Sequence, residues 1–320
     1  MDYVTLGKTG LRVSVAGFGC GGTSRLGLGR GKTEAEAIAL VRQALDMGVN
    51  MFDTAAAYGT EVVVGKAIKA VPRDSVVVAT KANIYRGSEL FPASRVIESL
   101  DNSLRQLDTD CIDVFQLHVV SPAVYDHALH EIAPALLREK EKGKFRHLGI
   151  TETSPNDPDQ KMLQRAVHDG IWEVMMLGFN LMNHNARHHV FPHTIANQIG
   201  TLMMFTVRHI FSQPGRLQAK MRELAAAGEV PQWLAEADDP LGFLIHPGGA
   251  SSLTDAAYRF VRHEPGVHVV LFGTSSPDHL KTNIDSLLKP PLPQDDRQKL
   301  AELFGHLRGV GFELPHAINT

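Results

Sequence analysis

The sequence has 320 residues, in which 32 Lys and Arg face 35 Asp and Glu, for a formal net charge of -3. This balance lacks the basic footprint of nucleic-acid-binding proteins, so we expect no nucleic-acid partner. No run approaches the ~20 apolar residues of a membrane span, and we expect neither a membrane partner nor a signal peptide. The only two cysteines, Cys20 and Cys111, exclude a disulfide framework and favour a cytoplasmic protein. We expect residues 1–320 to form one domain, because a barrel with extra loops needs roughly 250 residues or more.

The amino-terminal residues predict a small β-hairpin that precedes the main fold. Its strands are residues 3–6 and 11–15, and a Lys-Thr-Gly turn joins them. Residues 15–22 then form the first strand of the main fold.

The glycines of this first strand resemble a nucleotide-binding motif without its context. Gly17, Gly19 and Gly22 spell G-x-G-x-x-G, but a dinucleotide fingerprint needs a helix that opens at those glycines. Here the chain stays glycine-rich until Thr33. A P-loop is not predicted either, because Leu26 stands where its first glycine is required.

The next segment predicts a helix, a buried strand and a polar loop. Thr33 is a plausible N-cap, and Gly48 suits the position just after a helix. Residues 50–53 form a short apolar strand that ends at Asp53, and Tyr58 follows on a loop. Taken alone, the Tyr is a turn aromatic and the Asp a helix cap, so later strands must decide between these roles and a catalytic one.

Two further strands end in residues that carry chemistry. Residues 76–80 lead to Lys81, and residues 111–117 lead to His118, with a helix that opens at Pro92 between them. The carboxyl ends of neighbouring parallel strands meet at one edge of a sheet, where α/β enzymes keep their active sites. We therefore expect the Asp, Tyr, Lys and His side chains to lie close together.

Strands and helices continue to alternate along the rest of the chain. The remaining strands are predicted at residues 144–150, 173–177, 201–205 and 268–272. Helices are predicted at residues 127–142 and 252–263. Eight evenly interleaved strands favour an α/β fold of the closed (β/α)8 TIM barrel type over an open doubly wound sheet.

Two segments lie outside the regular alternation of strands and helices. Residues 207–249 are far longer than an ordinary loop after strand 7, so we interpret them as a functional lid. This segment carries a short helix at residues 217–227, and its apolar residues are candidates for lining a substrate pocket: Trp233, Leu241, Phe243 and Leu244. The tail after Pro290 predicts one helix at residues 295–308, followed by Gly311, Phe312 and Pro315, which we expect to reach toward the barrel mouth.

A cluster of four histidines raises the hypothesis of a metal-binding site. Its members are His184, His188, His189 and His193, at spacings that suit a metal ligand set. Pro192 interrupts the helical register, so a polar surface between a loop and a helix is the favoured interpretation, with no metal.

Four motifs resemble the aldo/keto reductase family, in order, over about residues 6–283. They are F-D-T-A-A-A-Y-G, A-T-K, S-L-R-Q-L-D-T-D-C-I-D-V-F-Q-L-H and G-K-F-R-H-L-G-I-T. The resemblance implies a (β/α)8 barrel, a nicotinamide cofactor and a catalytic tetrad of Asp53, Tyr58, Lys81 and His118. Tyr58 would be the general acid and base, activated by Lys81, which Asp53 would keep charged. His118 would hydrogen-bond the substrate carbonyl oxygen, and Trp233 would contact the substrate.

The resemblance also implies cofactor contacts, several of which depart from the family pattern. Phe205 matches the aromatic residue that stacks on the nicotinamide, and Asn283 the residue that contacts adenine. The other expected contacts are Cys20, Gly21, Thr151, Glu152, Met176, Arg208, Gly273, Thr274, Ser275 and His279. Five positions depart from the family pattern: Glu152 stands where Asn is usual, Met176 where Gln is usual, Arg208 where an apolar residue is usual, His279 where Arg is frequent and Thr282 where Glu is frequent.

The sequence therefore predicts an NAD(P)H-dependent oxidoreductase that interconverts an aldehyde, ketone or sugar carbonyl with its alcohol. The alternatives are an NAD-preferring aldose dehydrogenase and a cofactor-binding regulatory subunit. The expected cofactor is NADP(H), with NAD(H) as the alternative. With His279 where Arg is frequent, we expect NADPH to be preferred by about tenfold or less, equivalent to ~1.4 kcal/mol, with a larger preference at acidic pH.

Overall fold

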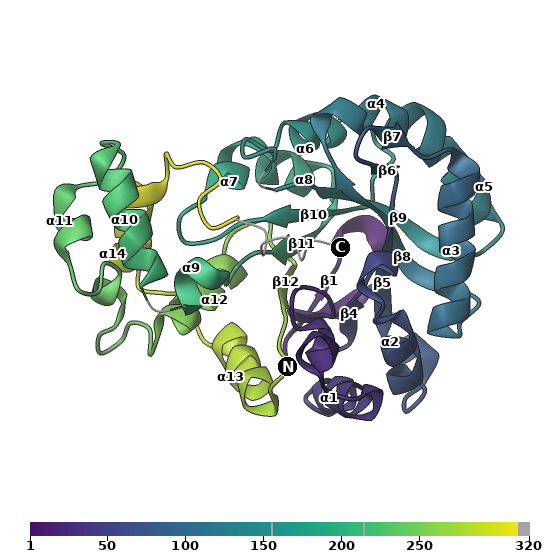
Figure 1. Cartoon of the computed structure of the whole chain (residues 1–320), viewed down its shortest axis with the longest axis horizontal. Helices are drawn as coiled ribbons and strands as arrows, with labels where there is room; N and C mark the ends of the chain where they lie inside the picture. Colours follow the sequence, from purple (N-terminus) through teal and green to yellow (C-terminus); the bar gives the residue numbers. More distant parts are fainter. Residues whose placement is uncertain (155, 214, 313–320) are drawn as a thin grey trace.

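The computed structural model describes residues 1–312 apart from 155 and 214. Eight parallel strands close into a barrel, in the order β10, β11, β12, β3, β4, β5, β8 and β9 (Figure 1). Their bounds are β3 Ala16–Gly19, β4 Met51–Asp53, β5 Val77–Asn83, β8 Ile112–Val120, β9 Phe145–Glu152, β10 Val174–Gly178, β11 Gly200–Met204 and β12 Val269–Phe272. The predicted (β/α)8 TIM barrel is thus confirmed.

The barrel strands match the eight predicted ones, but β5 and β8 run clearly further than expected. The predicted strand at residues 76–80 continues as β5 to Asn83, and the one at residues 111–117 continues as β8 to Val120. Lys81 and His118 therefore lie within strands rather than just beyond them. Neighbouring strand pairing supports the extension, because β5 and β8 are in register up to Asn83 opposite His118.

The amino-terminal hairpin closes one end of the barrel. Strands β1 Tyr3–Thr5 and β2 Arg12–Ser14 pair antiparallel, as predicted, around a 3-10 turn, η1, at Gly7–Thr9. Leu6 and Val13 join the apolar side chains that fill the barrel interior. Gly7 lies so close to the start of β11 that an added Cβ would stand 2.4 Å from the Gly200 nitrogen. The hairpin consequently leaves the opposite, carboxyl end of the barrel as the open mouth.

The larger part of the apolar core lies between the barrel and the outer helices. The main outer helices are α1 Glu34–Asp46, α2 Glu61–Ile68, α3 Ala93–Leu107, α4 Tyr125–His127, α5 Ala133–Glu141, α6 Lys161–Ala166, α7 Asn185–His189, α8 Phe191–Ala196, α12 Leu253–Arg262 and α13 Pro277–Leu288. A single π turn, η6 Ala128–Ile132, joins α4 to α5. Thr33 caps α1 in a capping box with Glu36, which confirms the predicted start of that helix.

Short irregular elements connect these layers. The remaining 3-10 turns are η2 Arg25–Arg30, η3 Ala56–Tyr58, η4 Arg73–Ser75, η5 Pro122–Val124 and η7 Gly242–Leu244. A small hairpin of β6 Tyr85–Arg86 and β7 Glu89–Leu90 follows β5 and was not predicted. Because Gly17 and Gly19 lie inside β3 and α1 begins only at Glu34, the G-x-G-x-x-G string opens no helix here, as predicted.

The long segment after β11 forms a helical excursion with the carboxyl-terminal helix. It contains α9 His209–Ser212, α10 Arg216–Ala226 and α11 Gln232–Glu236, and it packs with α14 Gln294–Phe304 at one end of the long axis of the molecule (Figure 1). The expected long loop after strand 7 and the helical tail are thus present. Among the residues that the structure describes, no helix combines the length and apolar character needed to cross a membrane.

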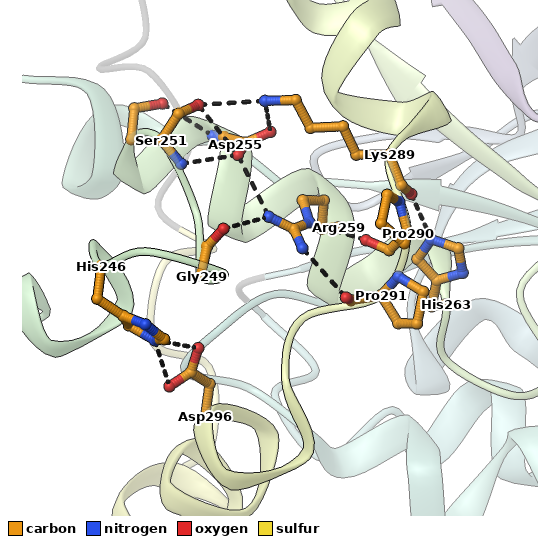
Figure 2. A network of polar contacts seen from close by, with 11 residues as sticks. His246, Gly249, Ser251, Asp255, Arg259, His263, Lys289, Pro290, Pro291 and Asp296 are labelled. Atoms are coloured by element: carbon orange, nitrogen blue, oxygen red, sulfur yellow. Dashed lines mark hydrogen bonds and ion pairs between the residues drawn. The ribbon is translucent and has the colours of Figure 1, made fainter.

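A polar network ties the excursion and the tail to α12 (Figure 2). The buried Arg259 guanidinium donates to the carbonyl oxygens of Gly249, Pro290 and Pro291, over 2.8, 2.8 and 3.1 Å. His246 pairs with Asp296 at 3.0 Å, which joins the end of the excursion to α14. One guanidinium thus donates to carbonyl oxygens at the end of the excursion and in the segment after α13, and it holds these two segments together.

Candidate active site

A buried ion pair lies at the mouth of the barrel. The Lys81 Nζ atom, on β5, is 2.7 Å from Asp53 Oδ2 at the end of β4 and also donates to the Thr54 carbonyl oxygen at 2.8 Å. The Lys81 side chain is fully buried and that of Asp53 nearly so. Burial acts to lower the pKa of Lys81, but the charges of Asp53 and Tyr58 and the hydrogen bond to Asp53 together outweigh it, so the net pKa is raised. Lys81 is therefore a fixed cation at neutral pH.

Tyr58 lies directly against this cation. It ends the η3 turn, and Lys81 Nζ is 5.0 Å from the centroid of its ring. Two of the three ammonium donors are engaged by Asp53 and Thr54, which leaves the third for the Tyr58 side. Burial raises the pKa of Tyr58, and the Lys81 charge opposes that rise without cancelling it. The phenol is thus protonated at neutral pH.

Gly21 makes room for the Tyr58 ring. A Cβ atom added to Gly21 would lie 2.4 Å from Tyr58 Cε2, closer than real side chains approach. Gly21 was expected to touch the cofactor, but its position is dictated by the phenol beside it. Any larger residue there would push the Tyr58 ring away from Lys81.

His118 completes the cluster from β8. Its Nε2 atom is 3.4 Å from the Tyr58 hydroxyl oxygen, and the two rings meet edge to face, 5.6 Å between centroids. Burial first, and then the charge of Lys81, lowers the pKa of His118 to about 3, so the imidazole is neutral. Its Nδ1 atom is 2.9 Å from Asn83 Oδ1. The four residues that the sequence singled out are thus brought together by β4, β5 and β8.

A strained backbone sits beside His118. Val119 adopts φ +51°, an uncommon conformation for a β-branched residue, at the point where the pairing of β8 with β9 shifts. The Val119 N–H donates to Thr151 Oγ1 at 2.7 Å, and the Tyr85 hydroxyl donates to the Val119 carbonyl at 3.1 Å. These contacts hold the backbone in place next to the imidazole.

A second polar site forms around the loop after β12. Thr274 and Ser275 are mostly buried there, and Ser276 caps α13, where its hydroxyl accepts from the His279 N–H at 3.4 Å. Lys32, from the far end of the β3 loop, donates to the Ser275 carbonyl oxygen at 2.6 Å. Backbone N–H groups at a helix start together with a lysine fit the phosphate groups of a dinucleotide.

The model of the aldo/keto reductase family matches residues 20–304 of this sequence. The chain belongs to the aldo/keto reductase family. It is 28% identical over 313 residues to the aldo-keto reductase YhdN of Bacillus subtilis (strain 168), covering 88% of this chain and 87% of that one. Over 157 residues it is 42% identical to the L-galactose dehydrogenase of Arabidopsis thaliana, covering 47% of this chain and 48% of the relative. The chain thus matches about half the length of that dehydrogenase.

A solved structure supports the same fold. The holo form of the aldo-keto reductase AKR11C1 from Bacillus halodurans matches with a TM-score of 0.72 at 23% identity, over 95% of this chain and 96% of the other. Membership of the aldo/keto reductase family makes the protein an NAD(P)-dependent oxidoreductase.

Three residues of this aldo/keto reductase that were expected at the cofactor have buried side chains. Cys20 is fully buried and its N–H donates to the Asp53 carbonyl, so it supports the tetrad from below. Glu152 is also fully buried: it accepts from the Gly178 N–H, and burial raises its pKa to about 7. Met176 packs among the apolar side chains inside the barrel. These side chains are enclosed because barrel strands alternate their side chains between interior and outer layer.

The other expected cofactor residues surround the mouth. Phe205, at the end of β11, is half-buried with φ +63°, and its ring lies 4.5 Å from the Arg208 guanidinium carbon. Phe312 of the tail contacts the Phe205 ring at 5.9 Å between centroids, so the tail reaches the mouth as expected. Pro315 lies outside the described residues. The remaining expected contacts lie on or beside the loop after β12: Gly273, Thr274, Ser275, His279 and Asn283.

Trp233 is not where a substrate contact requires it. It lies on α11 and is 44% exposed, with Lys299 of α14 stacked 5.4 Å from its ring centroid. The shallow cavity beside it is lined by α11 and α14 residues and by none of the tetrad. Leu241 and Leu244, also expected at a pocket, are buried and belong to the large apolar core between the barrel and the outer helices.

The histidine cluster separates in space. His184 is buried, with its ring 4.9 Å from that of Phe260 and its Nε2 atom 2.9 Å from the Leu181 carbonyl oxygen. The expected polar surface is thus wrong for His184, although His188 and His189 are exposed. In residues 1–312 without 155 and 214, no three His, Cys, Asp or Glu side chains gather in a way that could hold a metal ion.

Sequence reasoning missed three residues of the site. Asn83 and Lys32 contact it through side chains whose partners are 35 and 243 residues away. Val119 carries no sequence signal for its strained conformation. Only Asn83 had a usable signal, since it follows Lys81 by one full strand repeat on the same face of β5.

Proposed function

We propose that this aldo/keto reductase interconverts an aldehyde, ketone or sugar carbonyl and its alcohol, with Tyr58 as the general acid and base. The observation that carries the proposal is the half-buried phenol held between a fixed ammonium and a neutral imidazole. When bound, the nicotinamide cofactor supplies or accepts a hydride at the substrate carbon. The residues of this chain then have to manage the proton and the charge on the substrate oxygen.

Tyr58 supplies the proton in the reductive direction. Negative charge grows on the carbonyl oxygen as the carbon is reduced, and a protonated phenol at that oxygen neutralises it. Two unit charges ~4 Å apart at an effective dielectric of ~20 interact by roughly 4 kcal/mol, so Lys81 stabilises the phenolate that remains. Asp53 keeps Lys81 charged and in position by the 2.7 Å ion pair.

The raised pKa of Tyr58 sets the pH dependence of reduction. Because burial raises that pKa above the ordinary value of ~10, the acid form persists through neutral and mildly alkaline pH. The rate of reduction should therefore stay level to about pH 9 and fall only above it. The oxidative direction needs the phenolate and should instead gain with increasing pH.

The cofactor is NADP(H) or NAD(H), bound between the loop after β12 and the mouth. Lys32, the hydroxyls of Thr274 and Ser275 and the start of α13 support phosphate binding there. Phe205 supports the nicotinamide end, since it presents a half-buried ring at the tip of β11.

A second candidate is an aldose dehydrogenase that works oxidatively. The 42% identity to an L-galactose dehydrogenase over 157 residues favours it. The matched stretch covers only half of that relative, so the sugar itself is not carried over.

The test measures nicotinamide absorbance with NADPH and NADH over a panel of aldehydes and ketones, and with NADP+ and NAD+ over a panel of aldoses. Tyr58→Phe keeps the ring and removes only the proton donor, so kcat should fall about 10²-fold or more in both directions. Cofactor Kd, measured by fluorescence, should change less than about twofold. Retained turnover in Tyr58→Phe would remove Tyr58 from this role, and turnover with aldoses alone would establish the second candidate.

A further inference from the structure

The loop after β3 carries two basic side chains that reach opposite neighbours. In the barrel, β3 lies between β12 and β4. Lys32 reaches the loop after β12, where it donates to a backbone carbonyl oxygen. Arg25 reaches the loop after β4, where its Nη2 atom would stand 2.7 Å from a Cβ atom added to Gly59. Lys32 therefore belongs to the phosphate-binding side of the mouth, and Arg25 to the side of Tyr58.

The Arg25 guanidinium has no partner of its own. Among residues 1–312 apart from 155 and 214, no group forms a hydrogen bond or an ion pair with it. Arg25 is exposed, as is Gly59 beside it, whereas Tyr58 is half-buried. A guanidinium offers five N–H donors in a flat fork and keeps its charge at every physiological pH. These donors are thus available to a ligand that enters the mouth.

The backbone of this turn is held in an uncommon conformation. Arg25 and Leu26 have φ +44° and +61°, in the left-handed region that residues other than glycine rarely adopt. The Leu26 side chain is buried in the outer core, and Lys32 packs over Gly27. These two contacts anchor the strained turn, while Arg25 stays at the surface beside the Tyr58 loop. Strained residues of this kind concentrate at ligand-binding sites.

The charged residues in the loops that follow β3, β4 and β5 are all basic. No Asp or Glu stands in residues 20–33, 54–60 and 84–88. The basic residues of these loops are Arg25, Arg30, Lys32 and Arg86. Because the whole chain has a formal net charge of -3, this positive charge is a local property of the mouth. It attracts anions toward Tyr58.

We propose that Arg25 is a specificity-determining residue that binds an anionic group, a carboxylate or a phosphate, on the carbonyl substrate. This inference rests on the proposed function, because it adds a substrate contact to the reaction at Tyr58. Gly59 follows Tyr58 directly, so the guanidinium lies at the backbone end of the tyrosine side chain, and the reacting oxygen lies at its hydroxyl end. A substrate with a few carbon atoms between its carbonyl and its anionic group spans that separation. The guanidinium fork matches the oxygens of either anion.

Two pairs of aldehydes that differ in charge test this contact. One pair is 4-oxobutanoate and its uncharged methyl ester, and the other is glyceraldehyde 3-phosphate and glyceraldehyde. An exposed ion pair corresponds to about fivefold in kcat/KM, and we expect that advantage for the anion of at least one pair. The advantage should lie in KM rather than kcat, since the charge is remote from the reacting carbon. The pair that shows it identifies the anionic group.

Arg25→Gln removes the charge and keeps an unbranched side chain, so it adds no strain to the turn. It should reduce the advantage of the anionic aldehyde to about twofold or less without changing the rate for the uncharged one. Arg25→Lys should retain part of the advantage. Arg30→Gln removes an exposed arginine of the same turn, η2, and is the matched control that should keep the native ratio. Added salt should lower the advantage in the native enzyme but not in Arg25→Gln.

Binding of the anion can also be measured without turnover. 4-Hydroxybutanoate and glycerol 3-phosphate have no carbonyl group to reduce, so their Kd for the NADPH complex, from isothermal titration calorimetry, reports the contact alone. Arg25→Gln should raise the Kd of the matching alcohol about fivefold and change the Kd of NADPH less than about twofold. An equal rise in the Kd of NADPH would assign Arg25 to the cofactor and overturn the inference.

The two failures are distinguishable. Equal kcat/KM for the charged and uncharged members of both pairs, or an unchanged ratio in Arg25→Gln, overturns the role of Arg25 and leaves the proposed oxidoreductase in place. Absence of turnover with every carbonyl compound and aldose contradicts the proposed function. The Kd values of the two alcohols in native protein and Arg25→Gln then decide whether Arg25 binds an anion.

Discussion

The tetrad at the mouth and the excursion at residues 207–249 both carry residues that the sequence marked as functional, and they behave in opposite ways. Three of the tetrad side chains come from consecutive barrel strands whose register places them together, and Tyr58 follows on the η3 turn after β4. The buried apolar residues of the excursion instead join the large outer core, and Trp233 lies against Lys299 of α14, which comes from much later in the chain. The register of neighbouring strands follows from local sequence pattern and can be predicted from it. The segment against which a surface helix packs cannot be predicted in this way.

The difference also appears in the kind of burial. At the mouth, the charged side chains Lys81 and Asp53 are buried as an ion pair, and burial of charges is costly unless they are paired. In the excursion, the buried side chains are apolar and need no hydrogen-bond partners, and Trp233 is exposed. Substitutions at the mouth should therefore lower the catalytic rate, whereas substitutions in the excursion should only slightly lower the stability of the protein.

The largest effect should come from Lys81→Met. It removes the cation that stabilises the Tyr58 phenolate, so kcat should fall by about 10²-fold to 10³-fold. It also leaves Asp53 buried without its partner, which should lower the free energy of unfolding by about 3–5 kcal/mol, measured by urea denaturation. The double variant Asp53→Asn/Lys81→Met should recover most of that stability but none of the rate. Recovery of both would mean that the ion pair serves only folding.

A smaller effect is expected at the cofactor loop, between the two regions. Lys32→Met removes a cation whose Nζ is 2.6 Å from the Ser275 carbonyl. If a cofactor phosphate lies there, the Kd of NADPH should rise about tenfold and that of NADH about twofold or less.

His279→Ala is the control for the origin of this preference. A preference set by His279 should be lost in His279→Ala, whereas one set by Lys32 should survive that substitution. Equal losses for both cofactors in Lys32→Met would place the lysine at a phosphate that NADH and NADPH share.

The smallest effect should come from Trp233→Ala. Since Trp233 stacks with Lys299 of α14, away from the tetrad, KM for a bulky carbonyl should change less than about twofold. Loss of the cation–π contact should lower stability by about 1 kcal/mol or less, visible as a small decrease in Tm. A several-fold increase in KM with unchanged Tm would instead restore the interpretation of this segment as a substrate lid.

Much of the fold was predictable because its signals are short-range. Apolar strands alternating with amphipathic helices gave all eight barrel strands, and the capping residue Thr33 gave the start of α1. The predictions went wrong where contacts join distant segments. The burial of Cys20 and Glu152 and the separation of Trp233 from the mouth depend on what covers each residue.

The sequence by itself determined the barrel, the family and the juxtaposition of Asp53, Tyr58, Lys81 and His118, because strand order and register follow from local pattern. Their catalytic roles and the single-domain interpretation stay predictions. Only the tertiary structure decided that burial raises the pKa of Tyr58, that the Asn83 Oδ1 atom lies 2.9 Å from His118 Nδ1, and that Lys32 reaches Ser275. Desolvation and hydrogen-bond geometry depend on every neighbour in space, and those neighbours lie tens to hundreds of residues apart in the chain.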